Sequence, residues 1–114
     1  MTLRATYRDA GPVTVVDLSG RITLGDGSAL LRKTLRDLLE QKRTRILLNL
    51  ADVDYIDSSG IGEMVSGYTS VTGRGGELKL LSLTKKVHDL LQITRLFTVF
   101  DVHSDENVAV RSFR

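Results

Sequence analysis

The segment Ile46-Leu-Leu-Asn-Leu50 constrains the fold most, because it is short and almost entirely apolar. A strand with one face in water alternates apolar and polar residues, whereas a strand covered on both faces is a nearly continuous apolar run. Further along, the apolar residues recur at the spacing of a helix, at Ile61, Met64, Val65, Tyr68 and Val71. A doubly covered strand followed by an amphipathic helix is typical of an α/β domain.

The same change of periodicity recurs along the chain. Alternating or continuous apolar patterns predict strands at residues 3–7, 13–18, 46–50, 77–83 and 97–100. Helical patterns predict four helices. The first spans residues 28–41, with Asp26 or Ser28 as its cap, and the second spans residues 58–72. The third follows a cap at Thr84, and the fourth starts at Ser104. A turn at residues 9–12 makes the first two strands a hairpin, and residues 20–27 form a loop. The sequence thus predicts one α/β domain over residues 1–114, with a mixed β-sheet flanked by about four helices.

The composition argues against several kinds of function. Sixteen Lys and Arg are mixed with fourteen Asp and Glu, for a net charge of +2, so no surface typical of nucleic-acid binding is expected. The absence of cysteine excludes disulfides, thiolate metal sites and a cysteine nucleophile, and no His, Asp and Glu spacing resembles a metal site. No stretch approaches about 18 uninterrupted apolar residues, and the first residues lack a signal core. We expect a cytoplasmic protein without cofactor or metal and without direct membrane insertion.

Two hydroxyls and a carboxylate meet at the start of the second helix, in the Asp-Ser-Ser-Gly sequence of residues 57–60. A helix N-terminus has unpaired N–H groups and positive dipole character, which suit it to hold a phosphate. If Asp57 is the N-cap, Ile56 and Ile61 take the two positions of a hydrophobic staple, and the Ser58 hydroxyl is left free. If Ser58 is the cap, those positions hold an aspartate and a glycine, which make no apolar contact. The first frame is favoured, and it makes Ser58 a suitable phosphate acceptor.

Gly60 and Gly62 lie in the first turn of this predicted helix, where each glycine costs about 1 kcal/mol relative to alanine. Such a cost indicates that something lies close to the helix surface. Two explanations remain open: a partner approaches from outside, or the helix packs on a neighbouring loop such as residues 25–27.

The sequence lacks the usual nucleotide-binding and catalytic motifs. A dinucleotide-binding loop that began at Gly60 would need a third glycine at position 65, where valine stands, and no Gly-Lys-Ser or Gly-Lys-Thr is present. Neither His88 nor His103 is an obvious base for the serines at this junction, because each lies in another predicted element. We therefore predict a binding protein and not an enzyme.

The junction and its surroundings resemble a known family. Residues 47–62 look like the central motif of STAS domains, and in particular of stand-alone anti-sigma factor antagonists. Residues 15–22, 75–80 and 87–97 are similar to the elements of that domain on either side of the motif. The resemblance implies a single STAS domain with Ser58 as its phosphorylated residue.

What the resemblance implies about partners is also specific. An anti-sigma factor with serine kinase activity would bind the unphosphorylated protein and release its sigma factor, and a serine phosphatase would reverse the modification. ATP and magnesium would belong to the kinase. The expected partner-binding residues lie around the acceptor and in the loop after the second strand: Arg21, Thr23, Asp57, Ser58, Ser59, Gly60, Gly62 and Glu63.

This chain differs from the family pattern in one loop. Where relatives often have acidic residues, it has Arg21 and Thr23, which affects the choice of partner, and Arg21 could reach a phosphate on Ser58. The alternative interpretation is a STAS subunit of a transport or stressosome-type signalling complex, in which the serine is a contact and not a switch.

Overall fold

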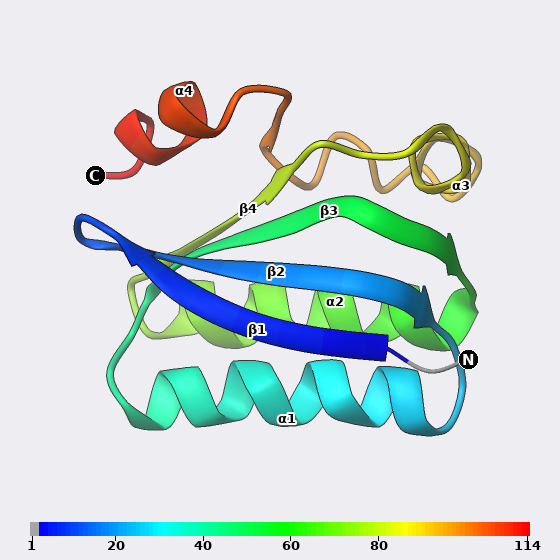
Figure 1. The fold of residues 1–114 in the computed structure, drawn as a ribbon, viewed down its shortest axis with the longest axis horizontal. Coiled ribbons are helices and arrows are strands. Elements are labelled where there is room, and N and C mark those ends of the chain that lie inside the picture. Colours follow the sequence, from blue (N-terminus) through cyan, green and yellow to red (C-terminus); the bar gives the residue numbers. More distant parts are fainter. Residues whose placement is uncertain (1–2) are drawn as a thin grey trace.

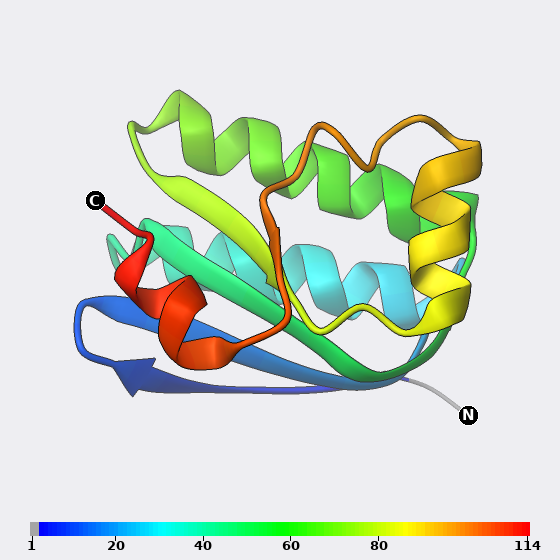
Figure 2. The same ribbon diagram turned by 90° about the horizontal axis from the view of Figure 1, so that it is seen from above.

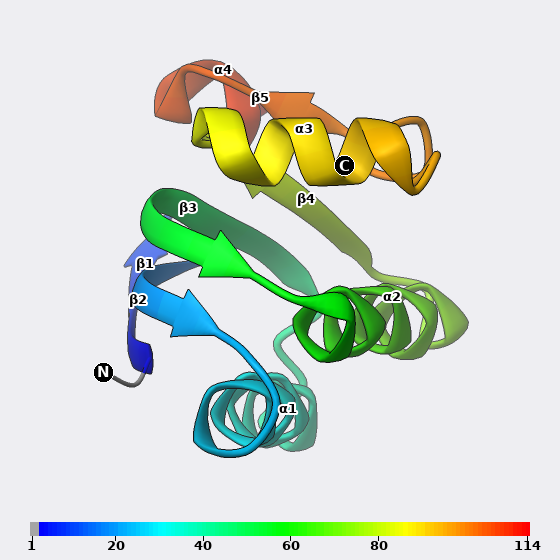
Figure 3. The same ribbon diagram turned by 90° about the vertical axis from the view of Figure 1, so that its right-hand side faces the viewer.

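The computed structural model describes residues 3–114, which form a five-stranded sheet between two layers of helices (Figure 1). Helices α1 and α2 cover one face of the sheet, and α3 and α4 lie over the other (Figure 3). The elements in chain order are β1 Leu3–Ala10, β2 Val13–Ile22, α1 Asp26–Glu40, β3 Arg45–Ile56, α2 Ser58–Gly73, β4 Glu77–Leu81, α3 Lys85–Ile93, β5 Val102–His103 and α4 Glu106–Arg111.

The strands lie in sequence order, β1-β2-β3-β4-β5. The β1–β2 hairpin is antiparallel and every later pair is parallel, which confirms the predicted mixed sheet. Because β2 and β3 are parallel neighbours, their carboxyl ends meet at one edge, where Ile22 lies opposite Ile56. The segments that follow these two strands are therefore adjacent in space.

The central strand is covered on both faces, as its apolar run predicts. Ile46 and Leu48 belong to the large core cluster beneath α1 and α2, whereas Leu47 belongs to a second cluster that includes Ala109 of α4. Successive side chains of a strand point to opposite faces, so one apolar run supplies both cores. The predicted apolar face of α2 is likewise confirmed: Ile61, Met64 and Val71 are buried, and Val65 and Tyr68 pack against the cluster.

The strand predicted at residues 97–100 is wrong, since these residues form turns and the last strand is Val102–His103. Their aromatic side chains are held by other contacts. Phe100 is buried with its ring edge-on to Tyr68, at 5.4 Å between centroids, and Phe97 packs against His88 at 4.8 Å. A turn and not a strand thus places the Phe100 ring in the core.

Several other boundaries and caps also differ from the prediction. The loop expected at residues 20–27 is shorter, because β2 continues to Ile22 through register irregularities. Helix α1 begins after Gly25 without a side-chain cap, so neither Asp26 nor Ser28 caps it. The last helix is capped by Asp105 and not by Ser104, since the Asp105 carboxylate accepts from the Val108 N–H at 3.0 Å.

Candidate phosphorylation and docking site

The candidate site lies at the sheet edge where β2 and β3 end. Strand β3 extends beyond the predicted residue 50 to Ile56 and thus carries the Asp-Ser-Ser-Gly sequence to this edge. The loop between β2 and α1 runs beside it. In open α/β sheets ligands bind at the carboxyl ends of the strands, because the loops there converge and helix N-termini point outward.

Asp57 holds the two segments together. One carboxylate oxygen accepts from the Gly60 N–H at 2.9 Å, which makes Asp57 the N-cap of α2 and confirms the favoured frame. The other oxygen accepts from the Leu24 N–H, also at 2.9 Å, and the Asp57 N–H donates to the Ile22 carbonyl at 3.2 Å. The two bonds that the carboxylate accepts lower the pKa of the Asp57 carboxyl below its ordinary value. The bond from Leu24 has the larger effect and the bond from Gly60 the next largest. The carboxylate is therefore occupied by the backbone.

Ser58 is the first residue of α2 and is exposed. Its hydroxyl makes no hydrogen bond to any other group of residues 3–114, because its neighbour Asp57 provides the cap. Ser59 is half-buried and lines a different hollow, between the starts of α1 and α2. Of the two serines, Ser58 is thus the more accessible at the positive end of the helix.

The two glycines of the first turn lie in opposite environments. Gly60 is buried, and a methyl group there would overlap the Ile22 carbonyl oxygen and the Ile56 side chain. Gly62 is exposed, with no atom within 4 Å of the position of a Cβ. Packing inside the chain thus explains Gly60. Any surface that a partner contacts here comes from Gly62 and its exposed neighbours.

The remaining predicted residues lie around this edge. The Arg21 guanidinium stacks over the Tyr55 ring, 5.1 Å from its centroid, because the two residues are opposite each other on β2 and β3. Thr23 is half-buried at the end of β2. Glu63 forms an ion pair with Arg32 of α1 at 3.4 Å.

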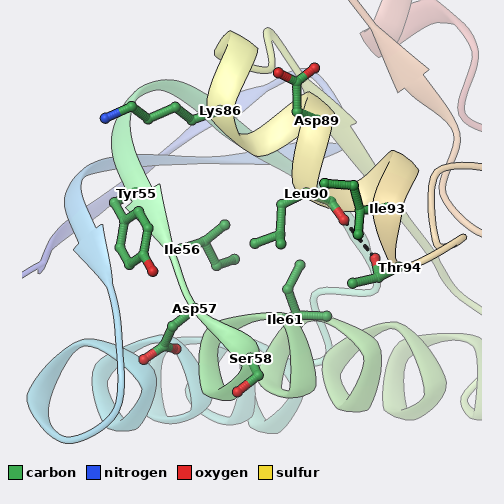
Figure 4. Close-up of a pocket in the computed structure, with 10 residues that line it drawn as sticks. All are labelled: Tyr55, Ile56, Asp57, Ser58, Ile61, Lys86, Asp89, Leu90, Ile93 and Thr94. Atoms are coloured by element: carbon green, nitrogen blue, oxygen red, sulfur yellow. Dashed lines mark hydrogen bonds between the residues drawn. The ribbon is translucent and has the colours of Figure 1, made fainter.

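A groove of about 600 Å³ opens next to Ser58 (Figure 4). The end of β3 and the start of α2 form one wall, and α3 forms the other. Ile56, Ile61 and Leu90 point into the space, and Lys86 and Asp89 lie at the α3 side. The residues that line the groove are Tyr55, Ile56, Asp57, Ser58, Ile61, Lys86, Asp89, Leu90, Ile93 and Thr94.

Sequence reasoning missed the α3 wall of this groove. Ile93 at the end of α3 is 78% exposed, and Leu24 in the β2–α1 loop is 79% exposed. A large apolar side chain in a polar loop, or at the last residue of a helix, was the available signal. Only the packing of α3 against β3 shows that Ile93 faces the same groove as Ser58.

The fold and the site together define a class of protein: a small α/β domain with an accessible serine at a capped helix start, beside an apolar groove. The family model of the STAS domain matches residues 4–109. The chain belongs to the STAS domain family.

The relatives named as anti-sigma factor antagonists confirm the predicted resemblance. The anti-sigma F factor antagonist of Paenibacillus polymyxa is 27% identical, over 93% of this chain and 91% of its own length. The anti-sigma-B factor antagonist of Bacillus subtilis is 32% identical, over 84% and 86%. The solved structure of the Bacillus cell fate determinant SpoIIAA in its phosphorylated form shares the fold, with a TM-score of 0.75 and 18% identity, over 96% of this chain and 98% of that one.

Two further structural findings bear on the site. No helix within residues 3–114 is both long and apolar enough to cross a bilayer. The same residues contain no group of three or more His, Cys, Asp or Glu side chains placed to hold a metal ion.

Proposed function

We propose that this protein is an anti-sigma factor antagonist switched by phosphorylation of Ser58. In its unphosphorylated form it binds an anti-sigma factor that has serine kinase activity, and the sigma factor is released. Phosphorylation ends this binding, and a serine phosphatase restores it. The observation that carries the proposal is the exposed Ser58 hydroxyl beside a capping aspartate, in a chain whose relatives are named as anti-sigma factor antagonists.

The physical basis of the switch is charge at an interface. A phosphoserine adds about −1.5 to −2 charge at pH 7. At the first position of α2 this charge meets the positive end of the helix, so the fold tolerates it. A partner that covers Ser58 must instead bury a dianion next to Asp57, which costs several kcal/mol unless a cation pairs with it. Two cations lie at this edge: Arg21, stacked on Tyr55, and Lys86, which lines the same groove as Ser58.

Single substitutions at Ser58 test the proposal. The anti-sigma factor kinases of the same genome are purified one at a time, and their affinity for each variant is measured by calorimetry. Ser58→Ala should bind like wild type and resist phosphorylation, whereas Ser58→Asp should bind at least about ten-fold more weakly. Ser66→Asp places the same charge at an exposed position two turns along α2 and should bind like wild type.

The fold and the phosphate position are checked in the same samples. All three variants should melt within a few degrees of wild type, and mass spectrometry should place the phosphate on Ser58. A phosphate on Ser59, or wild-type affinity for Ser58→Asp with every kinase, would contradict the proposal.

A further inference from the structure

A second hollow, of about 250 Å³, lies between α1 and α2, which run side by side (Figure 2) on the face of the sheet opposite α3 (Figure 3). Three arginines line it, and this arginine hollow is defined by Arg32, Arg36 and Arg74. We propose that it binds the phosphate group of a small phosphorylated metabolite. Ser58 does not line the arginine hollow, so ligand binding here is separate from the proposed switch.

The hollow has small side chains on its α2 side. Gly67 is buried, and a methyl group there would overlap the Leu35 side chain of α1, so this glycine lets the two helices approach each other closely. Ser66 and Ser70, on either side of Gly67 in the same helix, are exposed and line the hollow. Leu35 and Leu39 of α1 are buried and supply the apolar part of the lining. The hollow thus combines hydroxyl groups with a small apolar surface.

The charges of the lining do not balance. Glu63 is the one acidic residue that lines the hollow, and it pairs with Arg32 at 3.4 Å. Arg36 and Arg74 form no ion pair within residues 3–114. The Arg74 guanidinium donates to the Leu39 carbonyl at 3.2 Å, which holds it at the hollow. Three positive charges and one negative charge leave a net charge of +2.

The arginines of α1 are placed at a cost to the helix itself. Arg32 and Arg36 are four residues apart, and like charges at this spacing destabilise a helix. Another face of α1 has opposite charges at the same spacing, where Lys33 pairs with Asp37 at 2.7 Å. Glu40 follows Arg36 at this spacing too, yet the two form no ion pair. Ion pairs within the folded chain therefore do not explain Arg36, and its guanidinium is available to a ligand.

The lining suits a phosphate monoester. A guanidinium presents a planar fork of N–H donors that matches two oxygens of a phosphate, and serine hydroxyls can donate to the others. A phosphate monoester is close to a dianion at neutral pH, which matches the net charge of the lining. Since one water molecule takes about 30 Å³ in the liquid, 250 Å³ is more than a single tetrahedral ion needs. The buried leucines can contact the carbon atoms of the ligand.

Binding is tested by nuclear magnetic resonance of the isotope-labelled full chain, titrated with inorganic phosphate and with glucose 6-phosphate. Both should shift the amide signals of Ser66, Gly67 and Ser70 and the Nε–H signals of Arg36 and Arg74. The shifts should saturate with a Kd of about 1 mM or lower, and the sugar phosphate should bind more tightly than the free ion. Glucose, and sodium chloride at the same ionic strength, should produce no saturating shifts.

Substitutions assign the binding to the arginines. Arg36→Gln removes a guanidinium that has no ion pair to lose, so the variant should melt like wild type. It should weaken phosphate binding about ten-fold, because a hydrogen bond to a charged group contributes roughly this factor. Arg74→Gln should weaken binding to a similar extent. The matched control is Arg111→Gln, which removes the same charge from an exposed position of α4, over the other face of the sheet (Figure 3), and should leave the affinity unchanged.

Three outcomes would refute the site or its ligand. Shifts that do not saturate, or an equal loss of affinity in Arg36→Gln and Arg111→Gln, would mean that phosphate is attracted only by the overall charge. Shifts confined to residues 58–60 and unchanged in Arg36→Gln would mean that the anion binds at the start of α2. Binding of inorganic phosphate without binding of glucose 6-phosphate would exclude a monoester. None of these outcomes affects the proposed switch, which the substitutions at Ser58 test by themselves.

Discussion

At the scale of single residues, two glycines in the first turn of α2 differ in what they do. Gly60 faces the end of β2 and leaves room for the Ile22 carbonyl oxygen, so it lets the helix start close to the sheet. Gly62 faces open space. The sequence alone does not distinguish them, because glycine lowers the helix propensity by the same amount at either position.

Alanine substitutions should separate the two glycines by opposite changes in stability. Gly60→Ala forces a methyl group against backbone and should lower the free energy of unfolding by about 1–3 kcal/mol, as overpacking does. Gly62→Ala meets no neighbour and should raise it by up to about 1 kcal/mol through helix propensity. Urea denaturation of both variants measures this. Equal effects of the two substitutions would contradict the packing described for Gly60.

At the scale of elements, the sequence predicted most of the fold and the capped start of α2 at the candidate site. The change of periodicity from strand to helix was sufficient to predict β3 and α2. The staple pair of Ile56 and Ile61 identified Asp57 as the cap of α2. Such local patterns act within one or two turns, which is why one sequence reveals them.

The other half of the site depends on contacts between distant segments. The bond from Leu24 to Asp57 joins residues 33 positions apart, and the groove forms only where α3 packs on β3. Residues 97–100 show the same limit, since their apolar pattern predicted a strand where the chain forms a turn. Local periodicity carries no information on such pairings.

The two roles of Asp57, as helix cap and as anchor of the β2–α1 loop, should be separable. Asp57→Asn keeps an oxygen for the Gly60 N–H but offers an amide, and not a second carboxylate oxygen, to Leu24. It should cost about 1 kcal/mol of stability at neutral pH, and Asp57→Ala should cost about 2 kcal/mol.

The pH dependence of this cost follows from the lowered pKa of Asp57. A carboxyl whose folded pKa is lowered contributes stability above its ordinary pKa of about 4, and the contribution is lost as the pH falls through the folded value. The difference in unfolding free energy between wild type and Asp57→Asn should therefore shrink below about pH 4. A difference that stays constant from pH 7 to pH 3 would show that the ionised form has no special role.

At the scale of the whole molecule, the two ends of the sheet are built differently. Helix α3 lies over one end and α4 over the other (Figure 1), and α3 forms one wall of the groove. Polar contacts from β4 fix the α4 end. The Lys79 ammonium donates to the carbonyl and hydroxyl oxygens of Ser112, at 3.0 and 2.9 Å, and pairs with Asp101 at 3.1 Å, while its side chain is only 10% exposed.

Removing this ammonium should loosen the α4 end without affecting partner binding. Lys79→Met keeps the apolar stem but leaves the Ser112 oxygens without their donor, which should cost about 1–3 kcal/mol and lower Tm by several degrees. Lys33→Met removes an exposed pair with Asp37 and should cost less than about 0.5 kcal/mol. Calorimetric melting of both variants makes the comparison. If Lys79→Met melted like Lys33→Met, the attachment of α4 would not depend on this side chain.

The hydrogen bonds at the start of α2 have a consequence for how the proposed switch can evolve. Because the Asp57 side chain accepts the hydrogen bonds that cap α2 and anchor the β2–α1 loop, the Ser58 hydroxyl takes no part in these contacts. On the proposed function, a mutation at position 58 would make the protein permanently active or permanently silent in one step, and another would return it to control, while the rest of the domain is inherited unchanged. Signalling circuits built on the proposed switch would therefore be rewired at a single codon, with no compensating change elsewhere.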